Sequence, residues 1–217
     1  MTKPTLIYAY DPLCGWCFGF HPVIEKIAER FRESLHIQVI PGGLAIDENA
    51  QTISEGYSYI YTALKQTEET TGVEFGENFK LLAEEGSYFY DSEPACIAQT
   101  VVNKLSPDQA LTFAGNLHNA LFINGENLNE PEILGKIADE SGIDSEKFQA
   151  EYQKDSIRKE TREIFEWCKK MGASAFPTLL LQIEEETGLI SRGYRPFDTI
   201  ESHLHHLLNN IKKLQDG

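Results

Sequence analysis

The sequence has few cysteines, few basic side chains and no long apolar run, and each shortage argues against a class of protein. Four cysteines in 217 residues are too few for the disulfide framework of a small secreted domain. No run approaches the roughly 18 apolar residues of a membrane-spanning helix. Lysine and arginine number 19 against 34 acidic residues, a formal net charge of −15, so we expect neither nucleic acid nor a membrane as a partner.

A secretory signal is also missing from the beginning of the sequence. The first residues lack a basic segment followed by an apolar one, and strand-like sequence begins at Leu6. We therefore expect a cytoplasmic location. The chain is long enough to bury a hydrophobic core without crosslinks, so the cysteines are free for chemistry.

The most informative stretch contains two cysteines three positions apart. An apolar, β-prone run over residues 6–10 ends at Asp11, and Cys14 and Cys17 follow where a helical pattern begins. Unpaired N–H groups at the start of a helix favour negative charge, so Cys14 should be thiolate-rich near neutral pH. Cys17 lies one turn further on, within reach of Cys14. The spacing predicts dithiol–disulfide exchange, in which Cys14 attacks and Cys17 resolves.

The flanking sequence predicts a βαβ unit. Residues 6–10 and 36–40 are rich in apolar and β-branched side chains, and a helix of about residues 14–33 separates them. A crossover of this length is right-handed and places the two strands in parallel.

A second group of strands is predicted near the end of the sequence. Residues 178–183 and 189–194 should form an antiparallel hairpin around a turn at 184–188, and an apolar stripe predicts a helix over about 197–214. Between about residues 46 and 168 the pattern is helical throughout. We therefore expect an α/β protein with a helical segment inserted between its strands.

Several separated motifs resemble the thioredoxin superfamily, in particular the FrnE-type members of its DsbA-like branch. They are Cys14-Gly15-Trp16-Cys17, Ile40-Pro41-Gly42-Gly43-Leu44, Ser92-Glu93-Pro94-Ala95-Cys96, Ala120-Leu121-Phe122-Ile123-Asn124-Gly125 and Phe176-Pro177. The resemblance implies a thioredoxin fold, with a four-stranded mixed sheet built as βαβ then ββα and a large all-helical insertion. The corresponding division is a thioredoxin-like domain over 1–45 and 168–217 and an inserted helical domain over 46–167. The implied activity is that of a thiol–disulfide oxidoreductase or isomerase.

The resemblance also implies the second half of a site. Pro177 stands at the first position of a strand, where a proline is tolerated, and thioredoxin-like proteins have a cis-proline there that faces the cysteine pair. Phe176 and Pro177 would then dock the backbone of an extended substrate. Gly15 and Trp16, between the cysteines, would contact substrate and tune the redox character. The expected partners are protein or peptide thiols and disulfides, with glutathione or a thioredoxin-type reductant as possible reductants, and no cofactor is expected.

Two other functions remain open from the sequence. Kappa-class glutathione transferases and 2-hydroxychromene-2-carboxylate isomerases share a thioredoxin fold with a helical insert, although they typically keep a single Ser or Cys. A structural zinc site would need His21, Cys96 or Cys168 to converge on the cysteine pair, because no second CxxC is present. We expect no metal.

Buried packing explains the remaining cysteines and one histidine. Cys96 lies on the apolar stripe of its predicted helix, and we expect Cys168 to pack as a small hydrophobic residue in the same way. His118 has apolar neighbours, so it should be a packing histidine. Glu25, on the helix after the cysteines, is a candidate proton acceptor beneath the pair.

Overall fold

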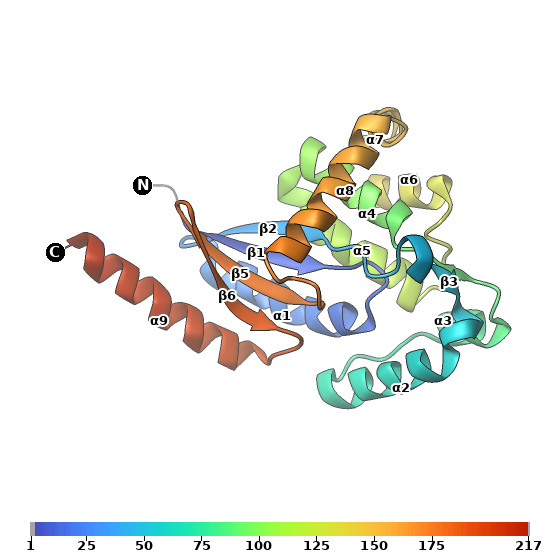
Figure 1. The fold of residues 1–217 in the computed structure, drawn as a ribbon, viewed down its shortest axis with the longest axis horizontal. Coiled ribbons are helices and arrows are strands. Elements are labelled where there is room, and N and C mark those ends of the chain that lie inside the picture. The colour runs from blue at the N-terminus through green and yellow to red at the C-terminus, as the bar shows by residue number, and fades with distance from the viewer. Residues whose placement is uncertain (1–2, 217) are drawn as a thin grey trace.

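The computed structural model describes residues 3–216, except for the side chains of residues 56–59 and 212–216. The helices and strands follow one another along the chain as coloured in Figure 1. They are β1 (Thr5–Tyr10), α1 (Gly15–Phe31), β2 (His36–Pro41), β3 (Gln51–Thr52), α2 (Ile53–Thr71), α3 (Glu77–Glu85), β4 (Phe89–Tyr90), α4 (Glu93–Leu105), α5 (Ala110–Phe122), α6 (Pro131–Glu140), α7 (Ser145–Tyr152), α8 (Asp155–Lys170), β5 (Thr178–Ile183), β6 (Glu186–Arg192) and α9 (Phe197–Asp216). Short 3₁₀ helices stand at Asp47–Asn49 and Pro107–Gln109.

The central sheet has the strand order β2-β1-β5-β6. β1 pairs in parallel with β2, as a right-handed βαβ unit requires, and β5 runs antiparallel to both β1 and β6. This mixed four-stranded sheet, with its βαβ and ββα halves, confirms the predicted fold class. The chain is an α/β protein with the thioredoxin fold and a large helical insertion.

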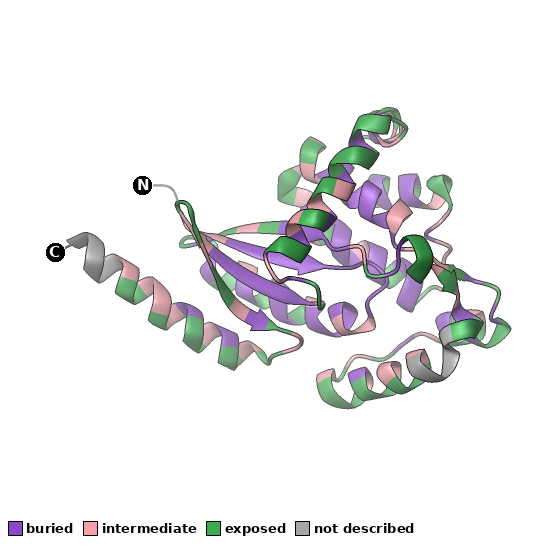
Figure 2. Ribbon diagram, viewed as in Figure 1, coloured by how far each residue is buried: buried purple, intermediate pink, exposed green. Residues whose placement is uncertain are grey.

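Side chains along β1 alternate between two different cores, and Figure 2 shows this strand buried after its first residue. Leu6, Tyr8 and Tyr10 pack with the apolar faces of α1 and α9. Ile7 and Ala9 point the other way, into a cluster that includes Cys168 and the partly buried Trp167 of α8. Both faces of the sheet are therefore covered by helices, and β1 is held in the middle.

The inserted helices between β2 and β5 form a core cluster of their own, to which Leu13, just before α1, and Phe18, in its first turn, also contribute. The segment carrying the two cysteines is thus packed against both parts of the molecule. The domain division at residues 46 and 167 remains a proposal.

Two details differ from the sequence-based predictions. The insertion contains a two-stranded ladder in which Gln51 pairs with Tyr90 and Thr52 with Phe89, too short to leave a periodic signal. The final hairpin turns more tightly than predicted: β6 begins at Glu186, because Glu184 adopts a left-handed φ of 53°. The first residues of β6 are polar, as an exposed edge strand allows. In the sequence they therefore resembled part of the turn.

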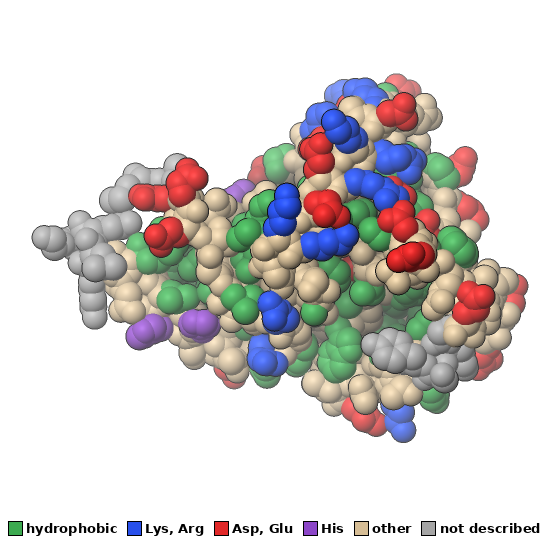
Figure 3. All heavy atoms as spheres, in the orientation of Figure 1, with side chains coloured by type: hydrophobic (Ala, Val, Ile, Leu, Met, Phe, Trp, Pro, Cys, Tyr) green, Lys and Arg blue, Asp and Glu red, His purple; other side chains and the backbone are tan. Residues whose placement is uncertain are grey.

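Charge is unevenly distributed on the face drawn in Figure 3. Lysine and arginine side chains gather over α8, whereas acidic side chains lie over several elements. Within the described residues, no helix combines the length and apolar character needed to cross a membrane.

Candidate active site

Cys14 stands at the junction between β1 and α1, where it is the N-cap residue of the helix. Its backbone N–H donates to the carbonyl of Asp11 at 3.1 Å, and its own carbonyl accepts from Cys17 N at 2.9 Å and Phe18 N at 3.0 Å. These bonds close the first turn of α1 and put Cys17 one turn after Cys14. Both cysteines are free thiols, so the structure describes the reduced pair.

The two thiols differ in exposure. Cys14 is 8% exposed, whereas Cys17 is fully buried. Burial raises the pKa of Cys17 well above its ordinary value, and the neighbouring Cys14 acts in the same direction. Cys17 is therefore held as a neutral thiol beneath the more accessible sulfur.

The Phe176–Pro177 peptide bond is cis and lies beside the pair. The Cys14 thiol donates to the Phe176 carbonyl at 3.6 Å, and the Pro177 carbonyl accepts from Gly193 N at 2.8 Å. Pro177 is buried, while Phe176 is half-buried. The loop before β5 thus presents a backbone carbonyl to the Cys14 sulfur across 162 residues of sequence.

The two residues between the cysteines lie against different elements. A side chain on Gly15 would contact Leu64 of α2 at 3.2 Å and Phe75 at 3.4 Å. The ring of Trp16 lies 6.5 Å from that of Tyr194, in the loop between β6 and α9. Gly15 and Trp16 are half-buried, so part of each faces solvent beside Cys14.

A cleft of about 390 Å³ opens near Gly15. Its lining includes Leu64, which belongs to α2, and Phe75, which precedes α3, and both also lie against Gly15. Lys65 and Glu68 bring charge to the cleft. A ligand in this cleft would lie next to the segment that carries the cysteines.

Two close neighbours of the site were not identified from the sequence. Gly42, directly after β2, is so close to the Phe176 ring that a β-carbon there would overlap it. Tyr90, from β4, donates its hydroxyl to the Leu13 carbonyl, next to Cys14. The glycine pair after β2 was noticed as a motif, but only the three-dimensional structure shows what Gly42 packs against.

Glu25, which the sequence suggested as a proton acceptor beneath the cysteine pair, does not lie there. Glu25 is exposed and pairs with His21 at 3.5 Å, which lowers the pKa of Glu25, so the idea that it accepts a proton beneath the pair was wrong. Asp11 is instead the fully buried carboxyl group of this region. Burial raises its pKa, although the hydrogen bonds it accepts oppose that effect.

The packing roles expected for other residues agree with their burial. Cys96, Cys168 and His118 are all at most 1% exposed. Within the described part of the chain, no group of three or more His, Cys, Asp or Glu side chains is arranged to hold a metal ion.

Three comparisons relate this chain to known proteins. A family model described as thioredoxin matches residues 8–202. The crystal structure of a candidate protein disulfide isomerase from Nitrosomonas europaea superposes with a TM-score of 0.86 at 29% identity, covering 96% of this chain and 99% of that one. The cytosolic disulfide reductase DsbM from Pseudomonas aeruginosa, solved alone and with GSH, shares the fold. Without GSH its TM-score is 0.79 at 23% identity, with 94% of this chain and 98% of that one covered.

One relative found by sequence is named as an adapter protein and not as a disulfide oxidoreductase. The ClpXP adapter protein SpxH of Halalkalibacterium halodurans is 23% identical over 205 residues, which cover 90% of this chain. The chain spans 65% of the length of that relative.

Proposed function

This chain belongs to the thioredoxin family, and on that premise we propose that it is a DsbA-like thiol–disulfide oxidoreductase acting on protein or peptide disulfides through Cys14 and Cys17. One observation carries the proposal: the Cys14 thiol at the start of α1 faces the Phe176 carbonyl at 3.6 Å and is 8% exposed, whereas Cys17, one turn further on, is fully buried. A pair arranged in this way can form a disulfide with a substrate and then release it.

The reaction follows from the positions of the two sulfurs. The Cys14 thiolate attacks one sulfur of a substrate disulfide, forms a mixed disulfide and expels the other substrate sulfur as a thiolate. Cys17 then loses its proton and attacks the Cys14 sulfur, which releases the second substrate thiolate. Two electrons pass to the substrate, and the chain is left with a Cys14–Cys17 disulfide. A dithiol or two molecules of glutathione would return the pair to the reduced state.

Burial explains why the two cysteines have different roles. Cys17 has no exposed surface and a strongly raised pKa, so it is a poor first nucleophile. Formation of the mixed disulfide brings a reactive sulfur–sulfur bond next to it, and proximity then favours resolution. Substrate backbone would lie along Phe176 and Pro177, and Gly15 and Trp16 would border it. The GSH-containing structure of DsbM supports glutathione as a reductant, and the cytosolic location in the name of DsbM supports a cytoplasmic one for this chain.

Two single substitutions test the proposal. Cys14→Ser should abolish reduction of a peptide containing one disulfide, because no accessible thiol remains in the pair. Cys17→Ser should accumulate a mixed disulfide between Cys14 and the peptide, seen by mass spectrometry as their covalent sum. Cys168→Ala is the matched control, because Cys168 is buried in a different cluster, and it should keep its activity.

Two results would overturn the assignment. One is a Cys14→Ser variant as active as the unaltered chain, and the other is a cysteine pair with no two-electron transition in graded glutathione buffers. Either would favour a protein-binding role of the kind named for the SpxH relatives.

A further inference from the structure

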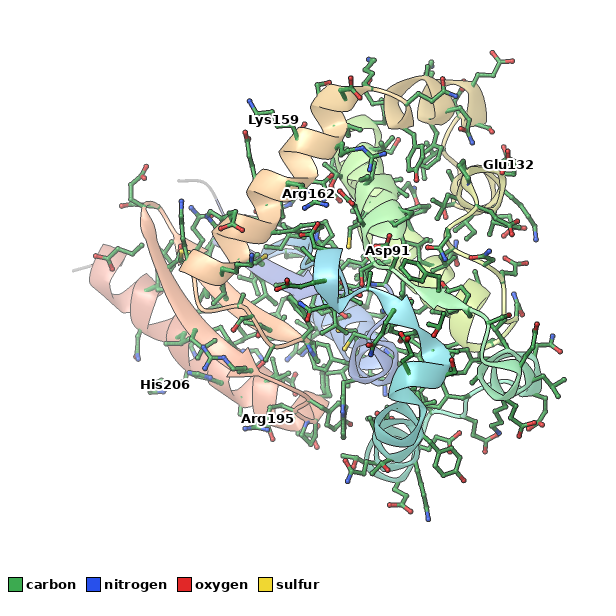
Figure 4. The ribbon with its side chains drawn as sticks, turned by 45° about the vertical axis from the view of Figure 1, so that its right-hand side comes forward. Asp91, Glu132, Lys159, Arg162, Arg195 and His206 are labelled. Carbon is green, nitrogen blue, oxygen red and sulfur yellow. The ribbon has the colours of Figure 1, made fainter. Side chains whose placement is uncertain are left out.

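The motif Ser92–Cys96 was prominent in the sequence, but the reaction above gives it no role. It links β4 to α4 and lies where the inserted helices meet the thioredoxin-like sheet. Figure 4 shows Asp91 at this junction and Arg162 reaching toward it from α8. Arg162 Nη2 donates to Glu93 at 2.8 Å, so α8 is tied to the start of α4. The segment is therefore held firmly within the insertion.

The same segment supplies two of the four donors to the buried carboxylate of Asp11. One oxygen, Oδ1, accepts from Leu13 N at 2.9 Å and from Ser92 Oγ at 2.8 Å. The other, Oδ2, accepts from Leu44 N at 2.7 Å and from Cys96 Sγ at 3.7 Å. The donors come from the cysteine loop, the loop after β2 and α4, so this carboxylate joins three parts of the chain.

Ser92 adds a second connection between the insertion and the loop after β2. Its hydroxyl donates to Asp11 and accepts from Ala45 N at 3.1 Å, while its own N–H donates to the Ala45 carbonyl at 2.8 Å. Ser92 is fully buried, so water cannot replace these bonds if the hydroxyl is removed.

The network leads directly to the nucleophile. The side chain of Asp11 accepts a hydrogen bond from Leu13 N. The backbone carbonyl of Asp11 accepts from Cys14 N at 3.1 Å and from His118 Nε2 at 3.2 Å. Tyr90 holds the Leu13 carbonyl from the other side. Every backbone group named here lies within three residues before Cys14 or on Cys14 itself. The position of Cys14 therefore depends on contacts made by the inserted helices.

We propose that Ser92 and Cys96 are positioning residues of the redox pair, which act through Asp11 to hold the turn that presents Cys14, so that the inserted helices help to set the redox equilibrium of the pair. The inference rests on the proposed function and adds a role for the Ser92–Cys96 motif. On this proposal the contacts stabilise the dithiol form more than the disulfide form, so weakening them moves the equilibrium toward the disulfide.

Ser92→Ala tests this role through the equilibrium of the pair with glutathione. The substitution removes one hydrogen bond to a buried charged group and leaves Ala45 N without its acceptor. We expect the ratio of disulfide to dithiol at a fixed glutathione poise to rise about fivefold, because only part of the stabilisation from a hydrogen bond to a charged group differs between the two redox forms. Ser141→Ala is the matched control: Ser141 is also a buried serine with two hydrogen bonds, made to Asn116 and Ile137.

Thermal unfolding separates positioning from a merely structural role. Both serine variants should unfold at lower temperature, but Ser92→Ala alone should shift the redox equilibrium. Equal equilibria for the two variants and the unaltered chain would overturn the inference while leaving the proposed function intact. A chain without any redox transition would overturn the proposed function, and this inference with it.

A second pair of variants covers the case in which Ser92→Ala does not fold. Cys96→Ala removes one of the two donors to Asp11 Oδ2, whereas Cys96→Ser keeps a donor at the same place. The equilibrium should move toward the disulfide in Cys96→Ala and stay near that of the unaltered chain in Cys96→Ser. The same shift in both variants would contradict the proposed hydrogen-bonding role.

Discussion

Replacing Gly42 by alanine should damage both stability and disulfide exchange. A β-carbon at Gly42 would overlap three carbons of the Phe176 ring, so the ring must move. Forcing extra volume into a packed region typically costs about 1–3 kcal/mol of unfolding free energy. The backbone of Phe176 cannot move freely, because Pro177 after it is buried and bonded to Gly193.

Movement of Phe176 should also affect the Cys14 sulfur. The Phe176 carbonyl accepts from Cys14 Sγ, so moving Phe176 alters the contact that faces the nucleophile. We expect the rate of peptide disulfide reduction to fall about tenfold, which corresponds to about 1.4 kcal/mol of lost transition-state stabilisation. Urea unfolding would measure the stability term, and a fluorescent disulfide peptide would measure the rate.

Gly188→Ala is the matched control for this substitution. Gly188 lies in β6, and a β-carbon there meets no atom within 4 Å, so this variant should keep its stability and activity. A double-mutant cycle gives the sharper check: in a Phe176→Ala background, Gly42→Ala should lose its stability cost. The steric argument is refuted if Gly42→Ala unfolds like Gly188→Ala, or if its cost is unchanged without the Phe176 ring.

Two further predictions concern buried polar atoms. Burial, and next the neighbouring Cys17 thiol, raise the pKa of Tyr8 well above its ordinary value. Because a thiol is a weak hydrogen-bonding group, Tyr8→Phe should change the free energy of unfolding in urea by no more than about 1 kcal/mol, and a larger loss would contradict this. Burial lowers the pKa of His118 to about 3, with a smaller effect from His21, so the unfolded chain binds the extra proton. The stability from neutral His118 should be complete above about pH 6.5 and fall by about 1.4 kcal/mol per pH unit down to about pH 3. His118→Gln should flatten this part of the stability profile, and an unchanged slope would contradict it.

The sequence determined the local elements and the place of the cysteine pair at the start of α1. The apolar run in β1, the cysteines at the start of α1 and the proline before β5 are each readable within a few residues, because strand, helix and turn preferences are local. The order of these signals along the chain was enough to predict the mixed sheet and the helical insertion. Boundaries shifted where the signal was weak, as at the polar first residues of β6.

Tertiary structure decided how these local signals meet. Asp11, Gly42 and Ser92 can be read from the sequence, but no residue next to them along the chain indicates which residue each one contacts. Asp11 accepts from Ser92 across 81 positions, and the partner of Gly42 is a ring from the other end of the chain. Such contacts depend on how whole helices pack against the sheet, and packing is a property of the complete fold. The sequence by itself therefore determined which groups are available for thiol chemistry, and the fold decided which backbone atoms and buried charges surround them.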